Sequence, residues 1–357
     1  DKELWKVAAD AAKDVIDNYG YELKKPDAES GEPTFDEVVE NIREITTTWG
    51  EDKNREIIWG HPNSIQWYAR CAVPGRWYGW NGRYSLPLGM INDFFMADGS
   101  KARPLEEWFE NKEFSTEDGN GTIANTFHMF VDREPRFYAW VAFQNGYYEV
   151  LRRDGADDNA NIVQTRFRKN DVFGIKERTT NYTPTGYLNK KGCSPLYNNI
   201  QEDVAAPHYP WPVIRMAELY LNLAEAYANL GRIDEAVAAL KPVRERAGLD
   251  PVDEAFEKAG LTLGRDEMIR MARQERTIEL YLEGHRFWDV RRWKEGDKYF
   301  NVRPKGMNYN GESDADFFRV TEVIVQRKFM TPMHYLMPIP KDDINKNERK
   351  FVQNPGY

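Results

Sequence analysis

The stretch from residue 77 to residue 84 gathers side-chain types that could hold a sugar. Its aromatic and planar polar members are Trp77, Tyr78, Trp80, Asn81, Arg83 and Tyr84. Aromatic rings can stack on the apolar C–H faces of a pyranose, while amide and guanidinium groups can hydrogen-bond its hydroxyls. The same rings could instead pack inward and hold an irregular loop together, because Trp is highly buried on average. The sequence leaves both interpretations open, and Trp67, Tyr68 and Trp108 are weaker candidates for the same role.

Histidines and cysteines do not occur in a recognisable catalytic or metal-binding pattern. The histidines are His61, His128, His208, His285 and His334, without an H-x-x-x-H pair. Cys71 and Cys193 lie far apart, so a single disulfide and two buried free thiols both stay open. We predict no metal ligands and no catalytic residues from these positions.

For two further motifs we prefer a structural explanation to a functional one. Asp154, Asp157, Asp158 and Asn159 could chelate Ca²⁺, but they lack the spacing of a known calcium loop, which favours a solvated turn. Residues 119–124 fit a G-x-G-x-x-A pattern, yet nothing before them reads as a buried strand. We therefore predict no cofactor.

Composition excludes some classes of partner. The 357 residues contain 58 Asp and Glu against 49 Lys and Arg, which gives a net charge of −9. Coating nucleic acid requires clustered Lys and Arg, so we predict no nucleic-acid partner, and anionic lipid surfaces are disfavoured for the same reason. The chain also has 18 Phe, 11 Trp and 19 Tyr at a mean hydropathy of only −0.74. So many rings in so polar a chain suggest that some of them line a ligand surface.

The first half of the chain alternates helical patterns with irregular stretches. Helices are predicted at 2–18, ending near Gly20, at 34–48 and at 88–97, with a short strand at 55–60. Residues 61–121 otherwise read as irregular loop because Gly, Pro and Trp punctuate them. Residues 136–150 contain two apolar runs around Asn145-Gly146, which predicts a β-hairpin.

The second half becomes strongly helical from residue 211 to about residue 293. Leu223, Ala224, Tyr227, Gly231, Ala236, Leu240 and Val243 have the spacing of one tetratricopeptide helix-turn-helix. One such unit cannot bury its own apolar faces, so its neighbours are degenerate, are supplied by the helices at 2–18 and 265–293, or lie outside this chain. Acidic and basic residues on the 265–293 helix, among them Glu275 and Glu279, are interpreted as partners in ion pairs.

Several motifs together resemble the SusD/RagB family. They are Trp211-Pro212-Val213-Ile214-Arg215-Met216-Ala217-Glu218-Leu219-Tyr220, Val243-Arg244-Glu245-Arg246-Ala247-Gly248, Glu275-Arg276, Glu283-Gly284-His285-Arg286-Phe287-Trp288-Asp289 and the ending Gln353-Asn354-Pro355-Gly356-Tyr357. Weaker matches, such as Asp132-Arg133-Glu134-Pro135-Arg136, extend the resemblance over most of the chain.

This resemblance implies a mainly α fold, a SusD-like scaffold of tetratricopeptide-type helices with a loop-rich region that contains a few short β-strands. We expect a scaffold helix at 1–20, the loop-rich ligand-binding region at 21–210, the tetratricopeptide-type helices at 211–300 and a C-terminal loop segment at 301–357 that closes onto the scaffold. The chain starts at Asp1 without a leader, so we interpret it as the C-terminal portion of a longer lipoprotein whose lipid anchor is absent here.

The function implied by the resemblance is capture of a glycan on the extracellular face of an outer membrane of the Bacteroidetes type. The partner would be a SusC-like TonB-dependent transporter that receives the glycan, and the protein would not be an enzyme. Two alternatives stay open: a glycoside hydrolase, which needs two carboxylates flanking the bond, and a peptide-binding tetratricopeptide module, which needs several regular repeats. Which glycan is bound, or whether a peptide is bound instead, is left open by the sequence.

Overall fold

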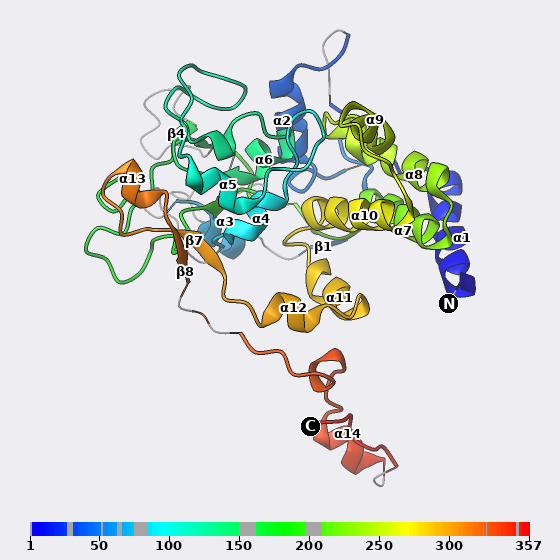
Figure 1. Cartoon of the computed structure of the whole chain (residues 1–357). Helices are drawn as coiled ribbons and strands as arrows, with labels where there is room; N and C mark the ends of the chain where they lie inside the picture. Colours follow the sequence, from blue (N-terminus) through cyan, green and yellow to red (C-terminus); the bar gives the residue numbers. More distant parts are fainter. Residues whose placement is uncertain are drawn as a thin grey trace. The chain divides into compact units, whose positions relative to one another are not determined.

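The computed structural model describes most of the chain and divides it into two compact units (Figure 1). The described residues are 2–26, 31–50, 53–62, 66–74, 84–149, 162–196, 209–323, 325, 327–347 and 350–357. Unit 1 comprises Asp1–Glu279 and Lys305–Thr321, and unit 2 comprises Leu280–Pro304 and Glu322–Tyr357. The candidate site residues identified from the sequence all belong to unit 1.

Long helices form the scaffold of unit 1. They are α1 (Lys2–Asn18), α7 (Met216–Leu230), α8 (Ile233–Arg246) and α10 (Arg265–Glu279), and the shorter α9 (Val252–Lys258) follows α8. α7 contacts α1, α8 and α10, and Figure 1 shows these helices side by side. The neighbours that the single tetratricopeptide unit requires are thus supplied by the first helix and by α10, as one of the three sequence-based options proposed.

The tetratricopeptide pattern predicts the α7–α8 turn correctly. Gly231 follows α7 with φ +79°, a left-handed conformation that Gly adopts without a Cβ penalty. Ala224 and Ala236 are completely buried, so the small residues of the pattern lie inside the packed unit. Part of the core is a cluster of Leu23 with Met216, Ala217 and Val243, which includes residues of α7 and α8.

Short elements make up the rest of unit 1. The helices are α2 (Phe35–Glu44), α3 (Gln66–Ala72), α4 (Leu88–Asp93), α5 (Leu105–Glu110), η1 (His128–Phe130), α6 (Pro135–Trp140) and α13 (Asp314–Phe317). The strands are β1 (Ile57–His61), β2 (Val141–Ala142), β3 (Tyr147–Glu149), β4 (Ile162–Gln164), β5 (Leu188–Asn189), β6 (Trp211–Arg215), β7 (Lys305–Met307) and β8 (Val320–Glu322). They form two-stranded pairs β1–β6, β2–β5, β3–β4 and β7–β8. The predicted fold class, mainly helical with a few short strands, is confirmed.

The β-hairpin predicted at residues 136–150 is wrong. Pro135 occupies the first turn of α6, where its fixed φ suits a helix, and the apolar run through Trp140 is helical rather than extended. Asn145 does form a turn with φ +68°. The strands on either side of this turn pair elsewhere, β2 with β5 and β3 with β4. The local signal identified the turn, whereas tertiary packing decided the partners.

Three predicted helices are shorter in the structure, and the one predicted at 88–97 is reduced to α4, which ends at Asp93. The 34–48 helix is reduced to α2, which begins at a capping box between Thr34 and Glu37. The 265–293 helix is interrupted after Glu279, because Leu282 and Gly284 both have positive φ, and its second part is α11 (His285–Arg292) of unit 2. A charged sequence pattern alone does not mark this break.

Unit 2 contains short helices and aromatic contacts. Its helices are α11, α12 (Gly296–Phe300), η2 (Met333–Tyr335) and α14 (Lys341–Lys346). The rings of Phe300 and Phe329 stack at 5.6 Å, and the Arg291 guanidinium lies 3.4 Å from the centroid of Phe287. Within the described parts of both units, no helix combines the length and the apolar character needed to cross a membrane.

Candidate functional site

The aromatic segment predicted from the sequence is described only at its C-terminal end. Trp77, Tyr78, Trp80, Asn81 and Arg83 lie outside the described residues, whereas Tyr84 lies within them. The position of the five undescribed side chains therefore stays a prediction, and Tyr84 gives the structural context from which the candidate site is built.

Tyr84 belongs to a cluster of half-buried aromatic rings with Tyr68 of α3 and Trp211 of β6. The Tyr68 ring lies 4.7 Å from the Tyr84 ring and 4.7 Å from the Trp211 ring, centroid to centroid. The Tyr68 hydroxyl donates to the Lys191 carbonyl at 2.7 Å and accepts from Asn189 Nδ2 at 2.8 Å. Since hydrogen bonds fix the polar end of Tyr68, its ring is held in place as part of a rigid platform.

The turn after β5 packs against this aromatic cluster through Gly192. Gly192 has φ +73°, and a Cβ at this position would lie 2.9 Å from the Trp211 ring and 3.2 Å from the Tyr68 ring. The Gly192 carbonyl accepts a hydrogen bond of 2.9 Å from the Tyr209 hydroxyl. Only a glycine therefore allows the rings to approach this turn so closely.

Of the weaker aromatic candidates, Trp108 is used for packing. It is 5% exposed, its indole N–H donates to Asn92 Oδ1 at 3.2 Å, and Arg103 lies over its ring at 4.9 Å. Tyr68 contacts Tyr84. The side chain of Trp67 lies outside the described residues.

Two cavities of unit 1 were not predicted from the sequence. The larger, of about 960 Å³, is lined by Tyr19, Tyr21, Trp49 and Tyr209 among others. The smaller, of about 400 Å³, is lined by Phe35, Tyr138, Phe143, Tyr147, Glu149 and Lys190 among others. Tyr19 and Trp49 each directly precede a glycine, which is the only local signal that these rings lie on turns.

A charged pair lines the smaller cavity. Lys190 Nζ lies 3.0 Å from Glu149 Oε1, and Arg43 Nη2 lies 3.5 Å from Glu149 Oε2. Burial lowers the pKa of Lys190 to about 8, an effect that the Glu149 carboxylate opposes only in part. The pKa of Glu149 itself is lowered, because Lys190 and Arg43 together outweigh the effect of its burial.

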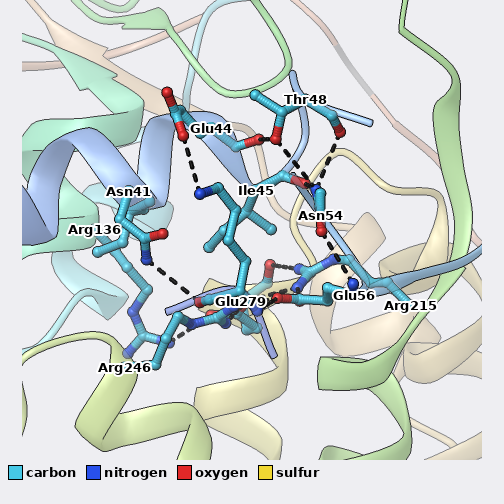
Figure 2. A network of polar contacts seen from close by, with 12 residues as sticks. Asn41, Glu44, Ile45, Thr48, Asn54, Glu56, Arg136, Arg215, Arg246 and Glu279 are labelled. Atoms are coloured by element: carbon cyan, nitrogen blue, oxygen red, sulfur yellow. Dashed lines mark hydrogen bonds and ion pairs between the residues drawn. The ribbon is translucent and has the colours of Figure 1, made fainter. Parts of the chain in front are cut away.

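Glu279, the last residue of α10, belongs to a buried network of charges (Figure 2). Glu279 Oε1 accepts from Arg215 at 2.8 Å and from Arg246 at 2.5 Å, and Glu279 Oε2 accepts from Arg136 at 3.0 Å. Glu56 lies on the other side of the same two arginines, at 2.6 Å from Arg215 and 2.7 Å from Arg246. The ion pairs predicted for Glu279 are thus confirmed, with partners on β6, α8 and α6.

The network continues through Glu275 and Glu134. Arg136 lies 2.5 Å from Glu275 and 2.6 Å from Glu134, and Arg244 lies 3.0 Å from the other Glu275 oxygen. The side chains of all four residues are fully buried. These contacts connect α6, α8 and α10, so the network fastens the loop-rich part of unit 1 to its scaffold helices.

Burial and neighbouring charges compete in setting the pKa values of this network. Burial favours the neutral form of Glu279, but the positive charges of Arg246, Arg215, Arg136 and Lys191 outweigh it and hold the pKa of Glu279 well below its ordinary value. For Glu134, burial dominates over Arg136 and raises the pKa. Three carboxylates raise the pKa of Arg136 despite its burial. Glu279 is therefore a permanent anion at neutral pH.

The remaining motifs of the sequence take structural places or lie outside the described residues. Gly119 and Thr122 bridge each other in a tight turn, so the G-x-G-x-x-A stretch does not follow the strand that a dinucleotide site requires. Cys71 and Cys193 are buried free thiols. Residues 154–159 are not described, and within the described residues no group of three or more His, Cys, Asp or Glu could hold a metal ion.

Comparison with known proteins identifies relatives along nearly the whole chain. A sequence model described as the SusD family matches residues 47–357. The SusD-like protein P2 of Formosa agariphila is 30% identical over 145 residues, which is 40% of this chain and 25% of that protein.

Solved structures show the same fold. The structure of BT4246 has a TM-score of 0.77 and 28% identity, and the match covers 100% of this chain and 65% of BT4246. A SusD-like protein from Bacteroides fragilis, BF3747, has a TM-score of 0.74 and 25% identity, with 100% of this chain and 62% of that one covered. This chain therefore spans less than two thirds of the length of these relatives.

Proposed function

The chain belongs to the SusD family, and we propose that it captures a glycan at the cell surface without cleaving it. The proposed contacts are the rings of Trp77, Tyr78, Trp80 and Tyr84, together with the polar groups of Asn81 and Arg83. The observation that carries this proposal is the half-buried cluster of Tyr68, Tyr84 and Trp211 at the C-terminal end of the segment. A fixed, partly exposed ring platform suits the apolar face of a neutral sugar.

The charge network supports a binding function over a hydrolytic one. A glycoside hydrolase places two carboxylates about 5–10 Å apart on either side of the bond that it cleaves. The acids of α10 that the sequence singled out, Glu275 and Glu279, are fully buried and held by arginines. Their geometry is that of packing residues, since a sugar cannot reach them.

The peptide-binding alternative requires a concave surface of several regular repeats. In unit 1, α7 and α8 form one clear helix-turn-helix, and α7 is covered by α1 and α10. We therefore favour the glycan, and assign the helices the role of scaffold.

Affinity electrophoresis tests this proposal. The protein is run in gels that contain amylopectin, xylan, mannan, laminarin or arabinogalactan, and each mixture is assayed for new reducing ends. We expect slower migration with at least one polysaccharide and no release of reducing ends. Release of reducing ends would assign a hydrolase, and normal migration in every gel, combined with retention on an immobilised peptide library, would assign the peptide module.

Delivery to a SusC-like TonB-dependent transporter and an extracellular location on the outer membrane are the second part of the proposal. They are supported by membership of the family, and the relatives BT4246 and BF3747 are longer than this chain, which spans less than two thirds of their length. Protease treatment of intact cells that express the full-length protein tests the location. Co-purification of a TonB-dependent transporter with the tagged full-length protein tests the partner, and recovery of the protein alone would contradict it.

A further inference from the structure

The larger cavity of unit 1 is an open groove with exposed aromatic walls. It lies between the residues that follow α1, the turn before β1 and the start of β6, and its volume is about 960 Å³. Sites for small organic ligands usually measure about 300–1,000 Å³. This groove is therefore large enough for more than one sugar ring.

The two outermost rings of the groove are not used by the fold. Tyr19 is 63% exposed and Trp49 is 55% exposed. Within the described residues, neither side chain takes part in a ring contact or a hydrogen bond. Their faces are therefore free to receive the apolar side of a ligand.

Polar groups accompany the rings along the same groove. Arg55 lines it and donates to the Gly20 carbonyl and to Glu22 Oε1. A guanidinium has five N–H donors, so within the described residues these two bonds leave three donors for a ligand or water. A groove that combines exposed rings with unused planar donors has the chemistry of a carbohydrate surface rather than of an apolar interface.

The groove and the aromatic cluster of the candidate site are connected through residues 209–211. Tyr209 and Pro210 line the groove, and the next residue, Trp211, packs on Tyr68. The Tyr209 hydroxyl is hydrogen-bonded to the Gly192 carbonyl, and Gly192 lies against the rings of Trp211 and Tyr68. Within residues 209–211, Tyr209 and Pro210 thus line the groove, and Trp211 belongs to the ring cluster.

We propose that this groove is a second carbohydrate-contacting surface beside the Tyr68–Tyr84–Trp211 cluster, so that a glycan chain long enough to reach both is held by both. This inference rests on the proposed function. The Tyr68–Tyr84–Trp211 cluster holds one part of the glycan chain, and Tyr19 and Trp49 contact sugar units further along it. Affinity then increases with chain length until the groove is filled.

The chain offers a matched control for a test of this groove. Trp59 of β1 is 59% exposed, comparable to Trp49, but it does not line the groove, whereas its neighbours Ile58 and Gly60 do. Trp49→Ala and Tyr19→Ala remove groove rings, and Trp59→Ala removes an equally exposed ring elsewhere. Because all three rings are largely exposed, we expect unchanged melting temperatures.

The experiment measures binding of malto-, xylo- or manno-oligosaccharide ladders, chosen by the polysaccharide that retards the wild type, to these variants by calorimetry. We expect Trp49→Ala to weaken binding of the long oligosaccharides about fivefold to tenfold, the scale of one lost ring contact, and to leave disaccharide binding unchanged. Trp59→Ala should bind every length as the wild type does.

The outcomes separate this inference from the function on which it rests. Equal affinities of Trp49→Ala, Tyr19→Ala and Trp59→Ala for every length would overturn the groove proposal. If Trp80→Ala then still loses binding, the proposed function stands and only the extended site fails. If neither the wild type nor any variant binds a glycan, the proposed function itself fails.

Discussion

The buried arginine–glutamate network and the aromatic surface around Tyr68 lie in the same unit but differ in how far their side chains are exposed to water. In the network, each oxygen of Glu279 accepts from an arginine, and the charged side chains are excluded from water. Around Tyr68, hydrogen bonds fix the ring edge and leave the cluster half-buried. The comparison indicates that the first region specifies the fold and that the second is available to a ligand.

The two regions should also differ in how much a mutation changes the free energy of unfolding. Breaking a buried ion pair leaves an uncompensated charge in a low-dielectric interior, whereas truncating a half-buried ring removes only a limited area of buried apolar surface. Mutations in the two regions should therefore separate stability from binding.

The largest expected effect on stability comes from Glu279→Gln. The change leaves Arg215, Arg246 and Arg136 short of one buried negative charge, and we expect a loss of about 3–5 kcal/mol in the free energy of unfolding. Urea denaturation measures it. The matched control is Glu245→Gln, since Glu245 is 53% exposed and pairs with Lys241 on the surface of α8; it should stay within about 0.5 kcal/mol of the wild type. Equal stabilities of the two variants would contradict the structural role of the network.

Acid should reduce this difference in stability. The pKa of Glu279 is lowered in the folded chain, so the unfolded chain takes up a proton first as the pH falls. Its contribution is fully present above the ordinary Glu pKa of about 4.5 and is lost as the pH falls towards the folded-state pKa. We expect the gap between the wild type and Glu279→Gln to narrow below about pH 4.5 in urea denaturation series. A stability gap that widens in acid would contradict a lowered pKa of Glu279 in the folded chain.

An intermediate effect is expected from Tyr68→Phe. The change removes a hydroxyl that donates to the Lys191 carbonyl and accepts from Asn189, while it keeps the ring. Asn189 Nδ2 retains its bond to Lys191, so we expect a cost of about 1 kcal/mol in thermal or urea unfolding. A cost as large as that of Glu279→Gln would mean that the cluster is required for the stability of the fold, which would contradict its role as a platform for a ligand.

Sequence patterns predicted much of the helical scaffold, whereas most of the predicted site residues lie outside the described part of the chain. The α7–α8 pair could be predicted because small residues and Gly231 must occupy fixed positions wherever two helices approach. The partners of β2 and β3 could not, since the Asn145 turn is local while β5 and β4 are distant in sequence. The helix break after Glu279 was also missed. Leu282 adopts a positive φ there, which its residue type does not favour.

For the candidate site, the sequence identified a segment rich in rings and could not identify the surface beside it. Tyr68 was considered only as a weaker candidate, and its importance depends on its contact with Trp211, which lies far away in the sequence. Tyr19 and Trp49 come from separate loops that only the fold brings to one groove. Burial of Glu56 with Glu279 is likewise a tertiary fact.

The smallest effect on stability, together with the largest on binding, is expected for Trp80→Ala. Measuring the glycan affinity and the melting temperature of this variant beside those of the wild type tests the central claim that the aromatic surface holds the ligand and the charge network holds the fold. We expect most glycan binding to be lost while the melting temperature stays nearly unchanged. An unchanged affinity would contradict it.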